Sequence, residues 1–260
     1  MSICGGKFCS IRQTYYQITA KFANDFPPNL PTLVVISYNL AMNNGAKNTY
    51  KPRVTDKILG FKLRSSGAVV IEGAKWCGKT TSAKRAAKSY LNALSNIFAV
   101  ESIKAWSPNL RSRTAIRSTD THYYVDPSIA ASSLKATPDG LIGDLNTFGF
   151  IFETLCIRDL RVYAYVNGGE VYHYRDKNDL ECDAVVTGND GKYGLIEIKL
   201  GQDDNTIGSA VISLNKLADK IDTTKMRAPT FKAVLTANGV AAYRRPEDGV
   251  YVVPIGCLKD

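Results

Sequence analysis

The stretch ECDAVVTGNDGKYGLIEIK, residues 181–199, decides how the C-terminal part of this chain folds. Two apolar runs flank a polar, glycine-bearing segment, residues 188–191, and this pattern predicts two short strands joined by a hairpin loop. Side chains alternate along a strand, so Glu197 and Lys199 are expected to share one face with Leu195, while the isoleucines between them point to the other face. Charged side chains are seldom fully buried unless they are paired, so two of them inside an apolar strand need an explanation.

The chemical explanation is a metal-dependent phosphodiesterase site. Asp183 in the first strand and Glu197 in the second are carboxylates that can hold a hard cation such as Mg²⁺, which prefers oxygen ligands. Such a metal polarises a phosphate oxygen and lowers the pKa of a bound water. Lys199 can orient that water or balance the charge that develops on the phosphorus. The pattern resembles the signature of the PD-(D/E)xK, restriction-endonuclease-like fold. The alternative is a surface Glu–Lys pair on an edge strand.

Composition bounds the class of protein. The chain has 260 residues, 45% of them hydrophobic, and its net charge of +9 favours polyanionic partners, nucleic acid before membrane. Its six cysteines include no C-x-x-C pair, and the two histidines do not neighbour a cysteine, so a zinc site is not expected. No apolar run is long enough to span a membrane, and we expect a reducing, cytoplasmic location without membrane contact.

A phosphate-binding loop precedes this region. Residues 68–72 (AVVIE) are expected to form a strand, and residues 73–81 (GAKWCGKTT) carry the Walker A pattern G-x-x-x-x-G-K-[ST] before a helix that starts at Thr80. The predicted nucleotide-binding residues are Gly73, Ala74, Lys75, Trp76, Cys77, Gly78, Lys79, Thr80 and Thr81. Lys79 would contact the outer phosphates of ATP, and the Thr80 hydroxyl would bind Mg²⁺.

The loop lacks the sheet that would support it. A P-loop ATPase needs several parallel strands and a carboxylate at the end of another apolar strand to hold Mg²⁺. No run of four apolar residues ending in two acidic residues follows, and Val125-Asp126 runs directly into Pro127, which is typical of a helix start. ATP binding is therefore expected to be weak or lost, and hydrolysis impaired.

Most of the chain resembles AAA-type ATP-binding proteins that carry a C-terminal domain of unknown function, DUF4143. The similarity begins with Tyr50–Lys88 and continues in residues 105–112 (AWSPNLRS), 124–130 (YVDPSIA), 144–153 (DLNTFGFIFE) and 251–257 (YVVPIGC). The central ATPase segment of those proteins is missing near Lys88. In nuclease-like folds a helix carboxylate precedes the first core strand, and that resemblance implies a role for Glu153 beside the Asp183–Lys199 site.

These patterns define an expected organisation. The fold class is mixed α/β: a poorly ordered extension (1–49), a truncated P-loop strand–loop–helix segment (50–89), a winged-helix-like remnant (90–135) and a restriction-endonuclease-like domain (136–260). In the third segment, Tyr90, Leu91, Leu94, Ile97 and Phe98 follow the spacing of a buried helix face. Helices are expected within 127–166 and at 207–221, and further strands at 170–175, 231–236 and 251–255.

Three functions remain open. The first is an ATP-binding protein with a nuclease-like domain that contacts DNA or a protein partner. The second is a metal-dependent DNA-binding or nuclease-type domain without ATPase activity. The third is a regulatory, non-catalytic protein-binding module. Nucleotide titration separates the first two, and a metal-dependent cleavage assay separates the last two.

Overall fold

The computed structural model describes residues 51–65, 69–71, 77–111, 116–117 and 119–258. The chain divides into two compact units with the boundary after Leu94, and each unit is described by itself. The expected N-terminal extension (1–49) and the first four residues of the Walker A pattern lie outside the described residues.

The described part of the first unit consists of two helices. Helix α2 spans Val54–Ser65. Helix α3, Lys79–Asn96, is longer than the predicted helix and continues past the unit boundary. The strand predicted at 68–72 is wrong for residues 69–71, which have no regular secondary structure, and Val70 is 82% exposed. Among the described residues of this unit no other strand offers an edge for pairing, so an apolar sequence alone does not produce a strand here.

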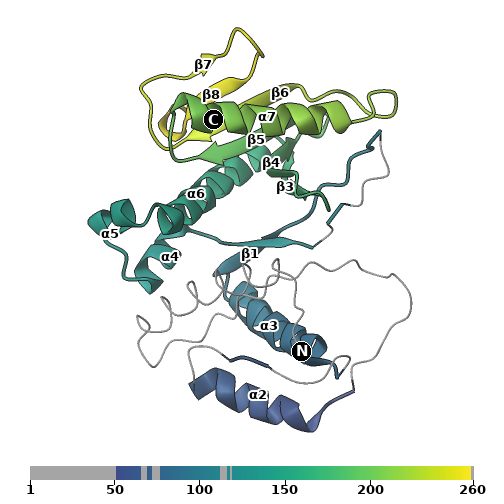
Figure 1. Ribbon diagram of the computed structural model, residues 1–260, viewed down its shortest axis with the longest axis vertical. Coiled ribbons are helices and arrows are strands. Elements are labelled where there is room, and N and C mark those ends of the chain that lie inside the picture. The colour runs from purple at the N-terminus through teal and green to yellow at the C-terminus, as the bar shows by residue number, and fades with distance from the viewer. Residues whose placement is uncertain (1–50, 66–68, 72–76, 112–115, 118, 259–260) are drawn as a thin grey trace, which may run out of the picture. The chain divides into compact units, whose positions relative to one another are not determined.

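The second unit contains a six-stranded mixed sheet (Figure 1). Its order is β3-β4-β5-β6-β8-β7. The bounds are Glu170–Arg175 (β3), Glu181–Thr187 (β4), Tyr193–Lys199 (β5), Phe231–Thr236 (β6), Tyr243–Arg244 (β7) and Tyr251–Pro254 (β8), which leads into a short 3-10 helix, Ile255–Cys257. Strands β3, β4 and β5 are antiparallel, whereas β5, β6 and β8 run parallel. The hairpin predicted at 181–199 is therefore confirmed, while β7 was not foreseen.

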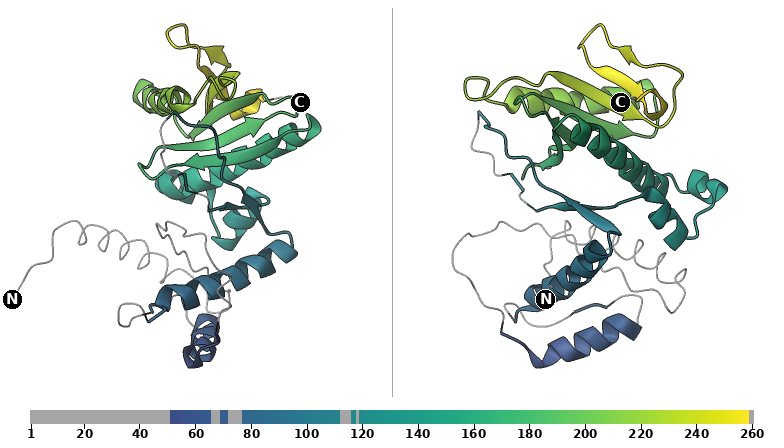
Figure 2. Two further views of the ribbon diagram at one scale, coloured as in Figure 1. Left: turned by 90° about the vertical axis from the view of Figure 1, so that its right-hand side faces the viewer. Right: turned by 180° about the vertical axis from the view of Figure 1, so that it is seen from behind.

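One long helix covers each face of this sheet (Figure 2). Helix α7, Asp204–Lys220, connects β5 to β6 and packs with Leu195, Val185 and Val234. Helix α6, Leu145–Val166, packs on the other face with Ile196, Ile198 and Leu235. The predicted alternation along β5 is confirmed, since Leu195 and the isoleucines enter different cores. A sheet with two apolar faces needs both helices to remove it from water.

A smaller layer precedes the sheet in sequence. Strands β1 (Val100–Ile103) and β2 (Thr121–Tyr124) pair antiparallel, and α4 (Pro127–Ser133) and α5 (Pro138–Gly143) follow. Asp126 and Asp144 cap α4 and α6 by accepting backbone N–H bonds, as expected of acidic side chains at helix starts. Ile103 belongs to the core beneath α6, so this layer is part of the fold that holds α6 in place.

The prediction of a buried helix face at residues 90–98 is wrong, most clearly at its end. Helix α3 stops at Asn96, and the next two side chains are exposed, Ile97 by 70% and Phe98 by 80%. Phe98 also has a positive φ of 56°, a conformation that ends a helix. Tyr90, Leu91 and Leu94 are only partly buried, and a left-handed turn after Asn96 redirects the chain into β1. None of the helices in the described part of the chain combines the length and apolar character that crossing a membrane requires.

Candidate active site

The candidate site lies where β4 and β5 separate. Their ladder ends at the pair Ala184–Ile196, so the next residues of the two strands do not exchange backbone hydrogen bonds. The backbone N–H of Ile198 donates to a side chain of the neighbouring strand rather than to a backbone carbonyl: Oδ2 of Asp183 accepts it at 2.7 Å. This bond fixes the carboxylate between the strands, and the sequence spacing of 183 and 197 brings it beside the end of β5.

Lys199 connects the two carboxylates. Its Nζ lies 2.7 Å from Glu197 Oε2 and 3.5 Å from Asp183 Oδ2. Glu197 is buried, whereas Asp183 and Lys199 are partly exposed, so one side of the cluster is accessible to solvent. Burial alone would lower the pKa of Lys199, but the charges of Asp183 and Glu197 outweigh it and raise that pKa. Lys199 is therefore a fixed cation in this cluster.

Glu197 is the unusual acid of the cluster. Burial, followed by the negative charge of Asp183, raises the pKa of Glu197 to about 7, although Lys199 acts in the opposite direction. A carboxyl whose pKa is near neutrality can exchange a proton, or a metal ion in place of the proton, at ordinary pH. This buried carboxyl with a raised pKa distinguishes the cluster from a surface Glu–Lys pair.

Glu153 approaches from α6 and is held by a residue that sequence reasoning missed. The hydroxyl of Tyr123, on β2, donates to Glu153 Oε1 at 2.6 Å. Burial and then the charge of Asp183 raise the pKa of Glu153, and burial and then Glu153 itself raise the pKa of Tyr123. Thirty residues separate the pair in sequence, and Tyr123 follows no recognisable motif, so only the packing of β2 against α6 identifies it.

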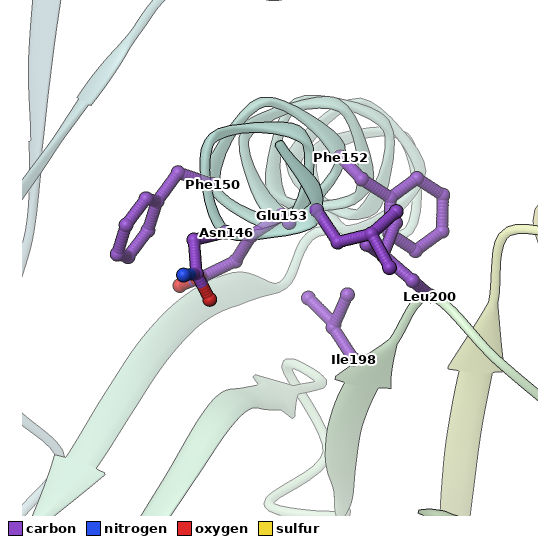
Figure 3. Close-up of a pocket in the computed structure, with 8 residues that line it drawn as sticks. Asn146, Phe150, Phe152, Glu153, Ile198 and Leu200 are labelled. Atoms are coloured by element: carbon purple, nitrogen blue, oxygen red, sulfur yellow. The ribbon is translucent and has the colours of Figure 1, made fainter. Parts of the chain in front are cut away.

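A hollow of about 250 Å³ lies beside Glu153 (Figure 3). It is formed by the first turns of α6 and the end of β5, and its walls are mostly apolar. The lining residues are Leu145, Asn146, Gly149, Phe150, Phe152, Glu153, Ile198 and Leu200.

The donor set suits a hard cation with open coordination positions. The described residues contain no cluster of three or more His, Cys, Asp or Glu side chains that could form a closed metal cage. Mg²⁺ and similar ions are commonly held by one or two carboxylates, with waters and substrate phosphates as the remaining ligands. Asp183 and Glu197 meet that requirement, provided that Lys199 gives up part of its contact with Glu197.

The Walker A segment belongs to the first unit. Gly73, Ala74, Lys75 and Trp76 lie outside the described residues, so their predicted role has no structural test. Cys77 and Gly78 form a bend, and Lys79, Thr80 and Thr81 open α3. Gly78 has φ +79°, and a Cβ there would overlap the Arg53 guanidinium, which donates to the Cys77 carbonyl at 2.9 Å. Only glycine fits this position.

Comparison with known proteins identifies two domain families. Residues 148–258 match a family described as Domain of unknown function (DUF4143), and residues 72–140 match a second one, Domain of unknown function (DUF8612). The expected DUF4143 resemblance is thus confirmed for the region that contains α6 and the sheet.

A solved structure with similar features was also found. It is a half-complex from a tetradecameric assembly of Thermococcus gammatolerans McrB AAA+ hexamers with bound McrC. The match has 10% identity and a TM-score of 0.29, and it covers 64% of this chain and 59% of that chain. A similarity this weak supports no conclusion about function. The comparison with curated proteins found no match.

Proposed function

We propose that the second unit is a metal-dependent phosphodiesterase domain of the nuclease-like class. The observation that carries the proposal is the convergence of Asp183, Glu197 and Lys199 at the separation of β4 and β5, with Lys199 Nζ 2.7 Å from one carboxylate and 3.5 Å from the other. A structural ion pair would need neither the second carboxylate nor the accessible side of the cluster.

The chain's own residues have distinct roles in this proposal. Asp183 and Glu197 would hold a divalent cation. When bound, this cation would polarise a phosphate oxygen and lower the pKa of a bound water. Lys199 donates to the scissile phosphate or to the attacking water and stabilises the negative charge of the transition state. Glu153, oriented by Tyr123, holds a water at the edge of the site. The raised pKa of Glu197 implies that metal binding displaces a proton near neutral pH.

The distribution of charge indicates how a nucleic acid would be attracted. Residues 1–94 contain 14 Lys and Arg against 3 Asp and Glu, whereas residues 95–260 contain 19 against 21. The positive net charge of the protein therefore resides entirely in the first unit. We propose that long-range attraction of DNA depends on residues 1–94, and that the second unit contributes the chemistry.

A metal titration followed by a cleavage assay tests this function. Mg²⁺ or Mn²⁺ should raise the melting temperature of the full chain, and single- or double-stranded DNA should be cleaved only when the metal is present. Lys199→Ala should abolish cleavage, while Lys177→Ala, which changes an exposed lysine on the β3–β4 turn, should not. If neither metal alters the melting temperature and no cleavage occurs, the domain is instead a non-catalytic, regulatory protein-binding module.

Weak ATP binding by the first unit is a second proposal. Its support is local: Gly78 has the positive φ that a phosphate loop uses, and α3 begins directly after it, at Lys79. Because no apolar run in this unit's sequence ends in the acidic pair that would hold Mg²⁺, we expect binding without efficient hydrolysis.

A further inference from the structure

The hollow beside Glu153 is not lined by Asp183, Glu197 or Lys199, but Glu153 connects it to these three residues. Glu153 lines the hollow, and both Asp183 and Lys199 act electrostatically on its carboxyl group. Ile198 and Leu200, the sequence neighbours of Lys199, form the wall on the β5 side. Because Ile198 and Lys199 point to opposite faces of β5, a molecule with its phosphate at Lys199 must pass around the end of this strand to enter the hollow.

The chemistry of the hollow combines flat apolar surface with one amide. Figure 3 shows Asn146 and Glu153 projecting from α6, with Phe150 beside them and Ile198 and Leu200 across from them. Phe150 is 70% exposed, although Phe152 on the same helix is buried in the core. An exposed aromatic ring next to an amide that can both donate and accept is the combination with which proteins stack an unpaired base and contact its edge.

The size of the hollow restricts what can enter it. About 250 Å³ lies below the ~300–1,000 Å³ of sites that enclose drug-sized ligands. This volume suits a small flat group such as one heteroaromatic base rather than a larger ligand. Gly149 contributes to the same surface: a Cβ added there would meet only Leu200 Cδ1, at 3.8 Å, so the absent side chain leaves the hollow open.

We propose that this hollow receives an unstacked base of single-stranded nucleic acid, next to the phosphate that is positioned by Asp183, Glu197 and Lys199. This inference rests on the proposed function for the position of the phosphate. It adds a preference for single strands or frayed ends, because a base inside a duplex cannot enter the hollow. It also explains how a unit without excess positive charge retains a nucleic acid: stacking replaces much of the backbone attraction.

The test uses the full chain and a fluorescent, single-stranded oligothymidylate in the presence of Ca²⁺, with the intactness of the strand checked on a gel. Anisotropy should show that Phe150→Ala weakens binding by about 5- to 150-fold, the range expected when stacking on an aromatic side chain is lost. Gly149→Met should weaken it as well by filling the hollow. Tyr165→Ala is the matched control, because Tyr165 is 84% exposed near the far end of the same helix. Each variant is first shown to melt like the wild type.

The outcomes separate this inference from the proposed function. If the Phe150 and Gly149 variants lose affinity but no metal permits cleavage, the base site stands and the phosphodiesterase proposal fails. If the wild type cleaves DNA and both variants bind and cleave like Tyr165→Ala, the phosphodiesterase proposal stands and the base site is refuted. Absence of oligothymidylate binding by the wild type also refutes it. Binding of a phenylalanine-containing peptide in place of the oligonucleotide, with the same dependence on Phe150, would identify a peptide site and overturn the inference.

Discussion

The ammonium group of Lys199 contacts Glu197, two residues earlier on the same strand, with 2.7 Å between Nζ and Oε2. Lys199 also lies 3.5 Å from Asp183 on the neighbouring strand, so one cation balances two carboxylates. Removal of Lys199 therefore leaves two carboxylates without a counter-charge in a partly buried site, whereas removal of either carboxylate leaves one balanced ion pair. The three side chains should thus respond differently to metal, pH and mutation.

Substitution of Glu197 by Gln should remove the stabilisation by metal. For the wild type, Mg²⁺ or Mn²⁺ at a hundred times its dissociation constant should add about 2.7 kcal/mol to the free energy of unfolding. Glu197→Gln should show little of this gain, because one of the two ligand carboxylates is lost. Thermal melting with and without metal measures the difference. An unchanged metal response would mean that Glu197 is not a ligand.

The same substitution should change the pH dependence of the metal-free protein. The pKa of Glu197 is raised from 4.5 to about 7, so the native state holds a proton that the unfolded state has released between these pH values. Wild-type stability attributable to Glu197 therefore falls as pH rises from 4.5 to 7, by at most about 3 kcal/mol. Relative to the wild type, Glu197→Gln should become more stable over this range. Urea unfolding at several pH values tests this, and a constant difference would contradict it.

Lys199→Ala should separate metal binding from catalysis. Lysine is not a ligand for a hard cation, so the melting temperature should still rise with Mn²⁺, and it should rise more than in the wild type because the competing ammonium group is gone. Cleavage of DNA should be lost. A variant that still cleaves at the wild-type rate would show that Lys199 only pairs with Glu197.

Tyr123→Phe should destabilise the protein through Glu153. The hydroxyl donates to a partly buried carboxyl group at 2.6 Å, and removal of a donor from a fully buried acceptor costs about 1–3 kcal/mol, so the lower end of this range is expected. Phe retains the ring, so packing should change little. A double-mutant cycle with Glu153→Gln, measured by urea unfolding, should show a coupling energy between the two residues. Additive effects would mean that Tyr123 does not position Glu153.

The P-loop segment should bind ATP weakly and turn it over at a rate near background. The sequence offers no Walker B acid to hold Mg²⁺, and a phosphate loop without the sheet of an ATPase core is expected to lose pre-organisation and with it affinity. Isothermal titration with ATP and Mg²⁺ measures the affinity, with Lys79→Ala as the control. A hydrolysis rate that drops sharply in Lys79→Ala would reveal an acidic residue that completes the ATPase site.

Residues 90–260 should fold without the preceding segment. The two apolar cores on either face of the sheet are made by side chains from the second unit. Expression of this fragment should give a cooperative thermal transition. A molten or insoluble product would mean that the first unit supplies part of the core.

Much of the second unit could be predicted from local patterns. The hairpin at 181–199, the strand at 231–236 and the helix at 207–221 each carry their own periodicity, and the structure places elements there. Prediction failed where neighbours decide the outcome. The apolar residues Val69, Val70 and Ile71 form no strand, and Ile97 and Phe98 continue an apolar spacing beyond the end of α3. In both cases the local sequence favours a regular element, but the described residues provide no neighbouring element against which it could pack.

By itself, the sequence determined which side chains on β5 share a face, because alternation is a property of any extended strand. It also determined that Asp183 and Glu197 lie on adjacent strands, because a short polar turn between two apolar runs forms a hairpin. Only the tertiary structure decided that the ladder opens beyond Ala184, that Tyr123 meets Glu153 across thirty residues, and that α6 leaves a hollow next to Ile198. These relationships depend on how helices and strands pack. Packing brings together residues that are far apart in the sequence, and no local sequence pattern indicates which of them will meet.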